Sequence, residues 1–418
     1  MNYKRLLGGA SAALMIGIAI FILAPGACAQ SKFKTLYKFR GHKDGGRPLA
    51  NLVFDTAGNL YGTTSEGGIG FKYGVVFKLT PNQDGSWTEN VLYSFPEYKD
   101  GVYPDAGLIF DQAGNLYGST EYGGTYNYGA VFELTPNLDG SWTESVLDSF
   151  SNGNDGGGPN GLIFDHAGNI YGTTAYGGAY GNGVVFKLTS NSDGSWTQSV
   201  LHAFNADGEL PYGRLIFDTA GNLYGTTFEG GPHGGGSVFE LTPNADGTWT
   251  ESTLYDFRGR AGGRHDGSLP VGVIFDQAGN LYGTTQAGGA TNYGVIFKLT
   301  PNPDGSWTET LLHHFTGGKD GGSPTGGLMF DLVGNLYGTA NVGGNLSYCS
   351  GAGCGVVFKL SPNSKGGWSE TVLHSFRGEQ GAVPGAGLTL DTQGNLYGTT
   401  MGTGWQDKSW GSVFEITP

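Results

Sequence analysis

Residues 111–120 read Asp-Gln-Ala-Gly-Asn-Leu-Tyr-Gly-Ser-Thr, and this stretch returns along the whole chain. Its central part, Gly-Asn-Leu-Tyr-Gly, occurs seven times, once with Ile in place of Leu, and the copies start at Gly58, Gly114, Gly168, Gly221, Gly279, Gly334 and Gly394. Successive copies lie 53 to 60 residues apart. Such a period predicts one supersecondary unit per copy, with each unit stacked on its neighbours.

Within one unit, turn residues separate four short apolar runs: Leu108–Asp111, Asn115–Thr120, Gly129–Thr135 and Ser141–Phe150. Each run has the length and composition of a β-strand. Gly114 and Gly140 lie in the short connections between runs, where glycine supplies the left-handed backbone conformation that a tight hairpin needs. The unit is therefore predicted to be a four-stranded antiparallel meander.

The composition excludes the other fold classes. Glycine accounts for 79 of 418 residues, which disfavours helix throughout the chain. The 38 % hydrophobic and 13 % aromatic content is too high for a disordered glycine-rich polymer. A four-stranded meander repeated around an axis is a propeller blade. The prediction is an all-β chain that forms a seven-bladed β-propeller, with residues 30–418 as one domain.

The two ends of the repeat array indicate how the ring closes. Residues 31–39 match the fourth strand of a unit but have no first three strands before them, and the last unit stops after its third strand. The N-terminal strand is therefore expected to complete the last blade, with Phe33–Phe39 paired to Val413–Ile416. This pairing removes the open sheet edges that invite aggregation.

The repeated motifs carry a family resemblance. The pattern Asp-x-x-Gly-Asn-Leu-Tyr-Gly-Thr-Thr, followed by Gly-Gly, by Gly-Val-Val-Phe-Lys-Leu-Thr-Pro and by Trp-Thr-Glu, resembles the GloVer tandem repeat. That repeat is found in exported bacterial proteins with varied surface anchors. The resemblance covers all seven units and implies export and tandem repetition. It implies no activity and no catalytic residues, and this chain ends at Pro418 without a sorting tail.

The N-terminus reads as a secretory signal peptide of residues 1–29. Lys4 and Arg5 precede the uncharged stretch Leu6–Ala24, and small residues lead to a cleavage position after Ala29. Two alternatives stay open: an uncleaved membrane anchor, and a lipoprotein lipidated at Cys28. The expected location is secreted, extracellular or periplasmic, with no membrane span in the mature chain, which is expected to be a monomer.

Charge and cysteine content limit the partners. The net charge is −14, and the few positive charges are scattered, so nucleic acid is excluded as a partner. Cys349 and Cys354 are the two cysteines outside the leader. In an exported protein, a pair so close together predicts a loop disulfide.

Most of the recurring aromatic residues are predicted to pack blades together, because every unit carries them at the same place. No serine-hydrolase, metalloprotease or phosphate-loop motif occurs in the sequence. A Gly-x-Gly-x-x-Gly starting at Gly156 has no helix after it and is a chance match.

One recurring set could carry chemistry. An Asp-Gly-x-x-Pro motif precedes the first strand of six units, and its aspartates are Asp44, Asp100, Asp155, Asp207, Asp266 and Asp320. Either each aspartate caps its own turn through backbone N–H groups, or the six form a ring at one mouth that holds a cation or a polyhydroxyl ligand. Calcium is the one cofactor left open.

Departures from the repeat on the same face supply further candidates for ligand binding, and they are His42, Arg47, Tyr98, Tyr103, His233, Arg258, Arg260, Arg264, His265, Trp405 and Trp410. Aromatic rings beside arginines suit a sugar ring or an anionic group. The predicted function is a binding or scaffold propeller for an extracellular carbohydrate or protein. The alternative is a secreted enzyme, a lyase or hydrolase acting on a polysaccharide or lactone.

Overall fold

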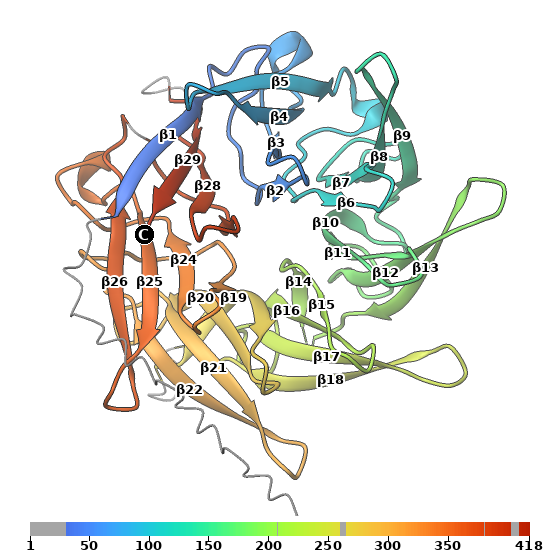
Figure 1. The fold of residues 1–418 in the computed structure, drawn as a ribbon. Coiled ribbons are helices and arrows are strands. Elements are labelled where there is room, and N and C mark those ends of the chain that lie inside the picture. Colours follow the sequence, from blue (N-terminus) through green and yellow to red (C-terminus); the bar gives the residue numbers. More distant parts are fainter. Residues whose placement is uncertain (1–30, 207, 260–264, 380, 403–408) are drawn as a thin grey trace, which may run out of the picture. The chain divides into compact units, whose positions relative to one another are not determined.

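Seven antiparallel sheets surround a central opening in the part of the chain that the computed structural model describes (Figure 1), which comprises residues 31–206, 208–259, 265–379, 381–402 and 409–418. The predicted signal peptide lies outside these residues. Residues 31–418 form one unit by their contacts. Each sheet is a four-stranded blade, and the inner strand of the fourth blade is split in two. The prediction of a seven-bladed β-propeller is confirmed.

In the first six blades the strands follow one another in sequence order from the channel outward. The first blade contains β2 (Val53–Phe54), β3 (Leu60–Thr64), β4 (Val75–Pro81) and β5 (Trp87–Ser94). The second contains β6 (Ile109–Phe110), β7 (Leu116–Thr120), β8 (Ala130–Pro136) and β9 (Trp142–Ser149). The third contains β10 (Gly157–Phe164), β11 (Ile170–Tyr176), β12 (Val184–Ser190) and β13 (Trp196–Ala203). The fourth contains β14 (Glu209–Pro211), β15 (Ile216–Phe217), β16 (Leu223–Glu229), β17 (Ser237–Pro243) and β18 (Trp249–Asp256).

The remaining blades repeat this order. The fifth contains β19 (Gly267–Phe275), β20 (Leu281–Gly288), β21 (Val295–Pro301) and β22 (Trp307–His314). The sixth contains β23 (Met329–Phe330), β24 (Leu336–Ala340), β25 (Val356–Pro362) and β26 (Trp368–Ser375). The seventh contains β27 (Thr389–Leu390), β28 (Leu396–Thr400), β29 (Ser412–Thr417) and the N-terminal β1 (Lys32–Lys38). Short 3₁₀ turns are η1 (Ile69–Phe71), η2 (Tyr98–Asp100) and η4 (Cys349–Gly351).

Ring closure has the predicted form. The first strand, β1, pairs antiparallel with the last, β29, so that Phe33 lies opposite Ile416 and Tyr37 opposite Val413. Figure 1 shows these two ends of the chain side by side in one blade. The seam is also packed, because the ring of Phe33 stacks on His374 of the sixth blade with centroids 3.8 Å apart.

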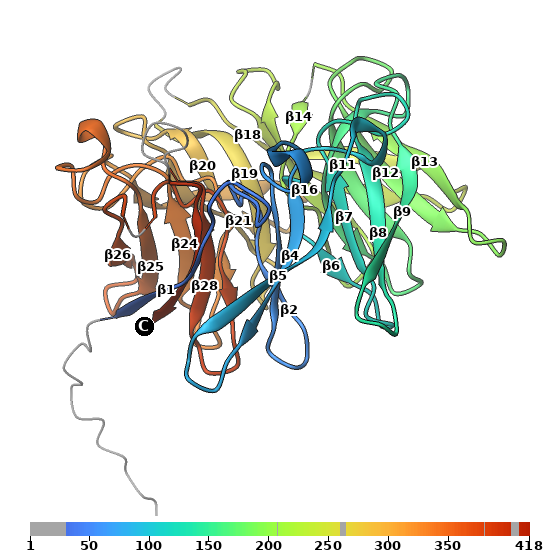
Figure 2. The same ribbon diagram turned by 90° about the horizontal axis from the view of Figure 1, so that it is seen from above.

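The two faces of the ring differ in their connections (Figure 2). One face, called here the hairpin face, carries the short turns between first and second strands and between third and fourth strands. The opposite face, called here the loop face, carries the longer connections between second and third strands and between blades. In the described ranges, no helix has the length and apolar character that a membrane span requires.

The Asp of each Asp-x-x-Gly-Asn-Leu-Tyr motif organises the first hairpin of its blade. In the first blade, Asp55 Oδ1 accepts hydrogen bonds from the backbone N–H groups of Ala57 and Asn59, both at 2.9 Å. Asp55 Oδ2 accepts from Asn59 Nδ2 at 2.6 Å and from Tyr61 Oη at 3.0 Å. One carboxylate thus satisfies four donors, which explains why this Asp recurs in every unit.

The Gly of Leu-Tyr-Gly is required for space rather than for backbone freedom. Gly62 lies opposite Phe77 in the pairing of β3 with β4, and a Cβ at Gly62 would lie 2.7 Å from Phe77 Cζ. The corresponding distance in the other six blades is 2.5 or 2.6 Å. All seven of these Phe side chains are fully buried. The pair therefore forms the centre of each blade.

The tyrosine of the motif joins neighbouring blades. Tyr61 is 4 % exposed, and its ring meets that of Phe110 in the next blade edge to face, with centroids 5.1 Å apart. Tyr397 of the seventh blade meets Phe54 of the first with the same 5.1 Å separation. This contact is the packing role that the sequence predicts for the recurring tyrosines, and it continues across the seam.

Removing β1 should destabilise the whole ring, because it exposes the β29 edge and removes Phe33 from the seam. A chain that starts at residue 41 is expected to melt at a clearly lower temperature than one that starts at residue 31. Circular dichroism during heating measures this. Equal melting temperatures for the two chains would contradict closure through β1.

Candidate functional site

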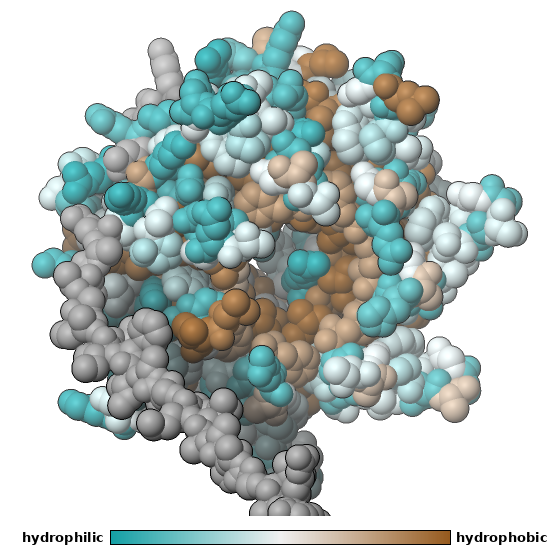
Figure 3. Space-filling view, in the orientation of Figure 1, coloured by the Kyte–Doolittle hydropathy of each residue, from teal (hydrophilic) through white to brown (hydrophobic). Residues whose placement is uncertain are grey.

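The candidate site is the central channel. It has a cavity volume of about 1320 Å³ and is lined by the inner strands of all seven blades. Figure 3 shows the opening bordered mainly by apolar surface, with polar side chains set among it. The apolar lining comes from Leu49, Val53, Val271, Met329 and Leu388 among others, and the side-chain amides come from Asn51, Asn160, Gln286 and Asn341. Mostly apolar walls with a few polar groups are typical of ligand sites.

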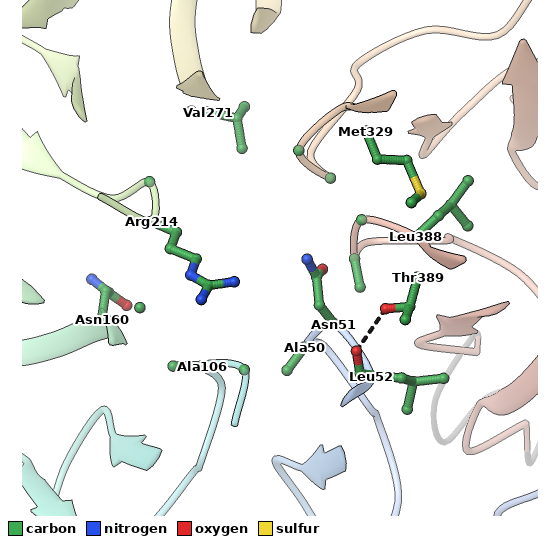
Figure 4. A pocket seen from close by; sticks show the side chains of 18 of the residues that line it. Ala50, Asn51, Leu52, Ala106, Asn160, Arg214, Val271, Met329, Leu388 and Thr389 are labelled. Atoms are coloured by element: carbon green, nitrogen blue, oxygen red, sulfur yellow. Dashed lines mark hydrogen bonds between the residues drawn. The ribbon is translucent and has the colours of Figure 1, made fainter. Parts of the chain in front are cut away.

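Arg214 is the one cation among the described residues that line the channel. It lies in the inner strand of the fourth blade, between β14 and β15. Its side chain extends into the open centre of the channel, toward Asn51 on the opposite wall (Figure 4). Figure 4 also shows the hydrogen bond of 2.6 Å that Thr389 Oγ1 donates to the Leu52 carbonyl, which ties the seventh blade to the first.

The charge of Arg214 is not neutralised within the described residues. Its guanidinium has no hydrogen bond or ion pair there. Although water in the channel reaches the side chain, the surrounding walls desolvate it and lower the pKa of the guanidinium from its ordinary value. An arginine stays protonated at physiological pH despite such a shift. The channel therefore presents a free positive charge with five N–H donors.

Arg214 also breaks the repeat at a defined position. It stands directly before the first apolar residue of the inner strand, where five other units have Gly107, Gly161, Gly272, Gly327 and Gly387. The first unit has Asn51 there. The sequence prediction considered departures in the loops and missed both residues. Comparison of the inner strands position by position would have found them.

The aspartates of the Asp-Gly-x-x-Pro motifs bind their own loops and the strand before them. Asp44 Oδ2 accepts from the Arg40 N–H at 3.0 Å and from Tyr37 Oη at 3.1 Å. Asp155 accepts from the N–H groups of Ser151 at 2.8 Å and Gly153 at 3.1 Å. These contacts are those of a turn cap.

The other aspartates of the set have similar partners. Asp100 accepts from Tyr93 Oη at 3.3 Å, Asp266 from Tyr255 Oη at 3.1 Å, and Asp320 from the Thr316 N–H at 2.8 Å. Asp207 lies outside the described residues. Among the described parts of the chain, no three His, Cys, Asp or Glu side chains converge as a metal site would need.

A glutamate from the outer strand of the blade that the loop enters approaches several of these aspartates. Burial, followed by the charge of Asp44, raises the pKa of Glu89 to about 7. Burial and the charges of Asp100 and Asp320 do the same for Glu144 and Glu370, whose pKa values also rise to about 7. These glutamates therefore hold a proton more tightly in the folded protein than in the unfolded chain.

The predicted loop residues are distributed as follows. Arg47 forms an ion pair with Glu66, with 3.1 Å between Nη1 and Oε1. Burial, then the neighbouring Tyr98, then the charge of Glu66 raise the pKa of Tyr103. His265 is exposed and lies near His314, whose pKa burial and the charge of His265 lower. Arg264 and Trp405, with Arg260, lie outside the described residues.

The backbone at Arg47 and Tyr103 belongs to the repeat. Both residues precede a proline and have positive φ, 56° and 58°, as do Leu210, Leu269, Ser323 and Val383 in other blades. Each such N–H donates to a carbonyl of the preceding blade, for example Tyr103 to Tyr73 at 3.1 Å. This shared bond compensates for the strain of a left-handed conformation. Only the side chains at these positions vary between units.

The remaining departures make local contacts. His42 meets the ring of Phe71 at 5.2 Å, Tyr98 meets Tyr73 at 5.3 Å, and His233 Nδ1 bonds Asp256. The Arg258 N–H donates to Asp266, and Trp410 covers Gly41. Cys349 and Cys354 form a disulfide with Cα atoms 5.3 Å apart.

The fold and the open, charged channel define the class, a repeat-built β-propeller with a central cavity. The sequence matches the Gloeobacter/Verrucomicrobia repeat over residues 19–143, 72–269 and 263–418. The chain belongs to this repeat family, which confirms the resemblance drawn from its motifs. A comparison with curated proteins finds no match.

Solved structures share the fold at low sequence identity. YCF48 from Cyanidioschyzon merolae is 12 % identical with a TM-score of 0.50, and the match covers 92 % of this chain and 99 % of that one. PorZ, a surface component of the type-IX secretion system of Porphyromonas gingivalis, is 16 % identical with a TM-score of 0.50 over 89 % of this chain and 46 % of that one. An oxidoreductase described as a glucose dehydrogenase from Thermus thermophilus is 18 % identical with a TM-score of 0.45, over 74 % and 95 %. At such identities the likeness extends to the fold alone.

The raised glutamate pKa values predict a pH dependence of stability. A carboxyl whose pKa rises from 4.5 to about 7 on folding contributes stability that is fully present below 4.5 and is lost as the pH rises to about 7. Between pH 5 and pH 8, the melting temperature of the triple variant E89Q/E144Q/E370Q should therefore fall by less than that of the parent.

Calorimetry at both pH values measures this difference, and the comparison with the parent removes the contributions of other titrating groups. The exposed Glu97→Gln is the matched control and should behave like the parent. A triple variant whose melting temperature falls as steeply as that of the parent would contradict the raised pKa values of these three glutamates.

Proposed function

We propose that the chain is an exported bacterial binding protein whose central channel holds a carbohydrate that carries a carboxylate. The observation that carries this proposal is the Arg214 guanidinium, which projects into the channel without a partner among the described residues. Export rests on the leader pattern of residues 1–29 and on the family resemblance.

Arg214 favours a carboxylate for geometric reasons. A guanidinium presents two parallel N–H donors that match the two oxygens of a carboxylate, and such charge-assisted bonds are stronger than neutral ones. In the desolvating channel, this interaction is also stronger than it would be in open water. A carboxylate at Arg214 would neutralise a charge that the described part of the protein leaves unpaired.

The rest of the channel suits a sugar. Asn51, Asn160, Gln286 and Asn341 supply both donors and acceptors for hydroxyl groups, and the apolar residues supply surface for the C–H faces of a ring. The volume of about 1320 Å³ exceeds the 300–1,000 Å³ of ordinary small-molecule pockets. An acidic oligosaccharide therefore suits the channel better than a single sugar.

The proposal predicts that a galacturonate trimer binds to the protein and that Arg214→Gln weakens this binding by roughly tenfold to a hundredfold, the range for hydrogen bonds to a charged group. Isothermal titration calorimetry measures both affinities. Arg377→Gln removes an exposed arginine outside the channel and should leave the affinity unchanged.

A neutral galactose trimer of the same linkage separates charge recognition from general sugar binding, and it should bind at least tenfold more weakly. Equal affinity for the two trimers, or an Arg214→Gln variant that binds like the parent, would contradict the proposal. Recovery of cleavage products of the trimer would instead support the alternative that the protein is an enzyme.

A further inference from the structure

A second, smaller pocket of about 30 Å³ lies beside the channel. Asp105, Ala106, Asn160 and Tyr212 line both spaces, so the two are contiguous. The rest of the small pocket is lined by Glu121, Gly158, Pro159, Ala175 and Tyr176. Asp105 lies shortly before β6, at the end of the loop that enters the second blade, and Glu121 comes directly after β7. The volume of this small pocket is about that of one water molecule or one ammonium group.

One oxygen of the Asp105 carboxyl lacks a donor, whereas the Glu121 carboxyl lies within hydrogen-bond reach of the Tyr122 hydroxyl. Protein encloses the Asp105 carboxyl on nearly every side, and its Oδ1 is shielded from solvent with no hydrogen-bond partner among the described residues. Burial, and then the adjacent Glu121 within hydrogen-bond reach, raise the pKa of Asp105 well above its usual range. Two ionised carboxylates are both acceptors, so this pair needs a proton or a cation between them.

The charged groups around the pair do not supply that cation. Arg47 lowers the pKa of Asp105, but its guanidinium pairs with Glu66, whose own charge acts in the opposite direction. The other titratable neighbours are Tyr122, Tyr176 and Tyr212. The charge of Glu121, followed by burial, raises the pKa of Tyr122 to about 12, so this phenol stays neutral. Burial, followed by the charges of Asp105 and Glu121, raises the pKa of Tyr212 to about 12, so it stays neutral as well.

We infer that this pocket binds the protonated primary amine of an amino sugar. An alkylammonium group has three N–H donors, and the Asp105 and Glu121 carboxylates offer acceptors for them. Two carboxylates would desolvate and neutralise one such cation, as in a buried ion pair with complete hydrogen bonding.

The tyrosines favour an organic cation over a metal ion. Tyr176 and Tyr212, which line the pocket, are 42 % and 52 % exposed, which leaves ring surface available there for the body of a sugar. An aromatic face also attracts an ammonium group. Calcium takes six to eight oxygen ligands, and in the described part of the chain no set of three acidic or His side chains converges here.

The amine pocket adjoins the channel, but its charged residues, Asp105 and Glu121, are not those of the carboxylate site at Arg214. It goes beyond the proposed function, because it names a second charged group that a ligand can carry at the edge of the channel. Binding the ammonium replaces the proton that the two carboxyl groups share, and that proton passes to the buffer. Amine binding should therefore be accompanied by proton release.

The test uses titration calorimetry at pH 7 with glucosamine, methylammonium and N-acetylglucosamine, in buffers of different ionisation enthalpy. Glucosamine should bind with proton release, methylammonium more weakly, and N-acetylglucosamine, which lacks the charge, at least tenfold more weakly than glucosamine. Asp105→Asn and Glu121→Gln should each weaken glucosamine binding by tenfold or more. Glu229→Gln removes an exposed carboxylate outside the pocket and should have no effect.

Arg214→Gln separates this inference from the proposed function, because it should reduce galacturonate binding and leave glucosamine binding intact. Equal affinity for glucosamine and N-acetylglucosamine, or an Asp105→Asn variant that binds glucosamine like the parent, would overturn the amine site. Binding of potassium ions with the same proton release, in the absence of glucosamine binding, would also overturn it.

Discussion

The contact between a third-strand phenylalanine and a second-strand glycine is the constraint on which the rest of the structure depends. In each blade the ring occupies the space that a Cβ would need, as at Gly62 and Phe77. Close packing of this kind tolerates no added methyl group. The contact fixes the spacing of the two strands, and the adjacent tyrosine then carries the packing to the next blade. Seven identical contacts therefore produce a ring of seven similar wedges.

That packing scheme leaves certain positions free. Residues directly before the inner strand face the channel, and five of the seven units have glycine there, so no blade contact depends on a side chain at this position. Arg214 and Asn51 are added to a ring that packs without them. The left-handed residues before each proline illustrate the same division, since their backbone bonds are shared by the blades while side chains such as Arg47 and Tyr103 differ.

The fold could be predicted from the sequence because each unit repeats its own turns and apolar runs. The closure through Phe33 could be predicted too, since one strand was missing at one end and present at the other. The repeat identifies Arg214 and Asn51 as departures at one position, but it could not predict where their side chains point. That Arg214 points into an open space follows from the curvature of the ring, whereas Asp105 lies beside Glu121 because Val102 pairs antiparallel with Tyr122 within the second blade. The sequence also left the role of Asp44 and its equivalents open, because donors such as Tyr37 belong to the strand before the loop.

The central claim is that residues which repeat hold the ring together and that those which break the repeat on the channel wall do not. The most direct measurement is the free energy of unfolding, by urea denaturation, of the variant N51G/R214G, in which these positions match the other five units. The account predicts a loss of no more than about 2 kcal/mol, because each added glycine costs roughly 0.5–1 kcal/mol in backbone entropy. A much larger loss, or loss of cooperative unfolding, would contradict it.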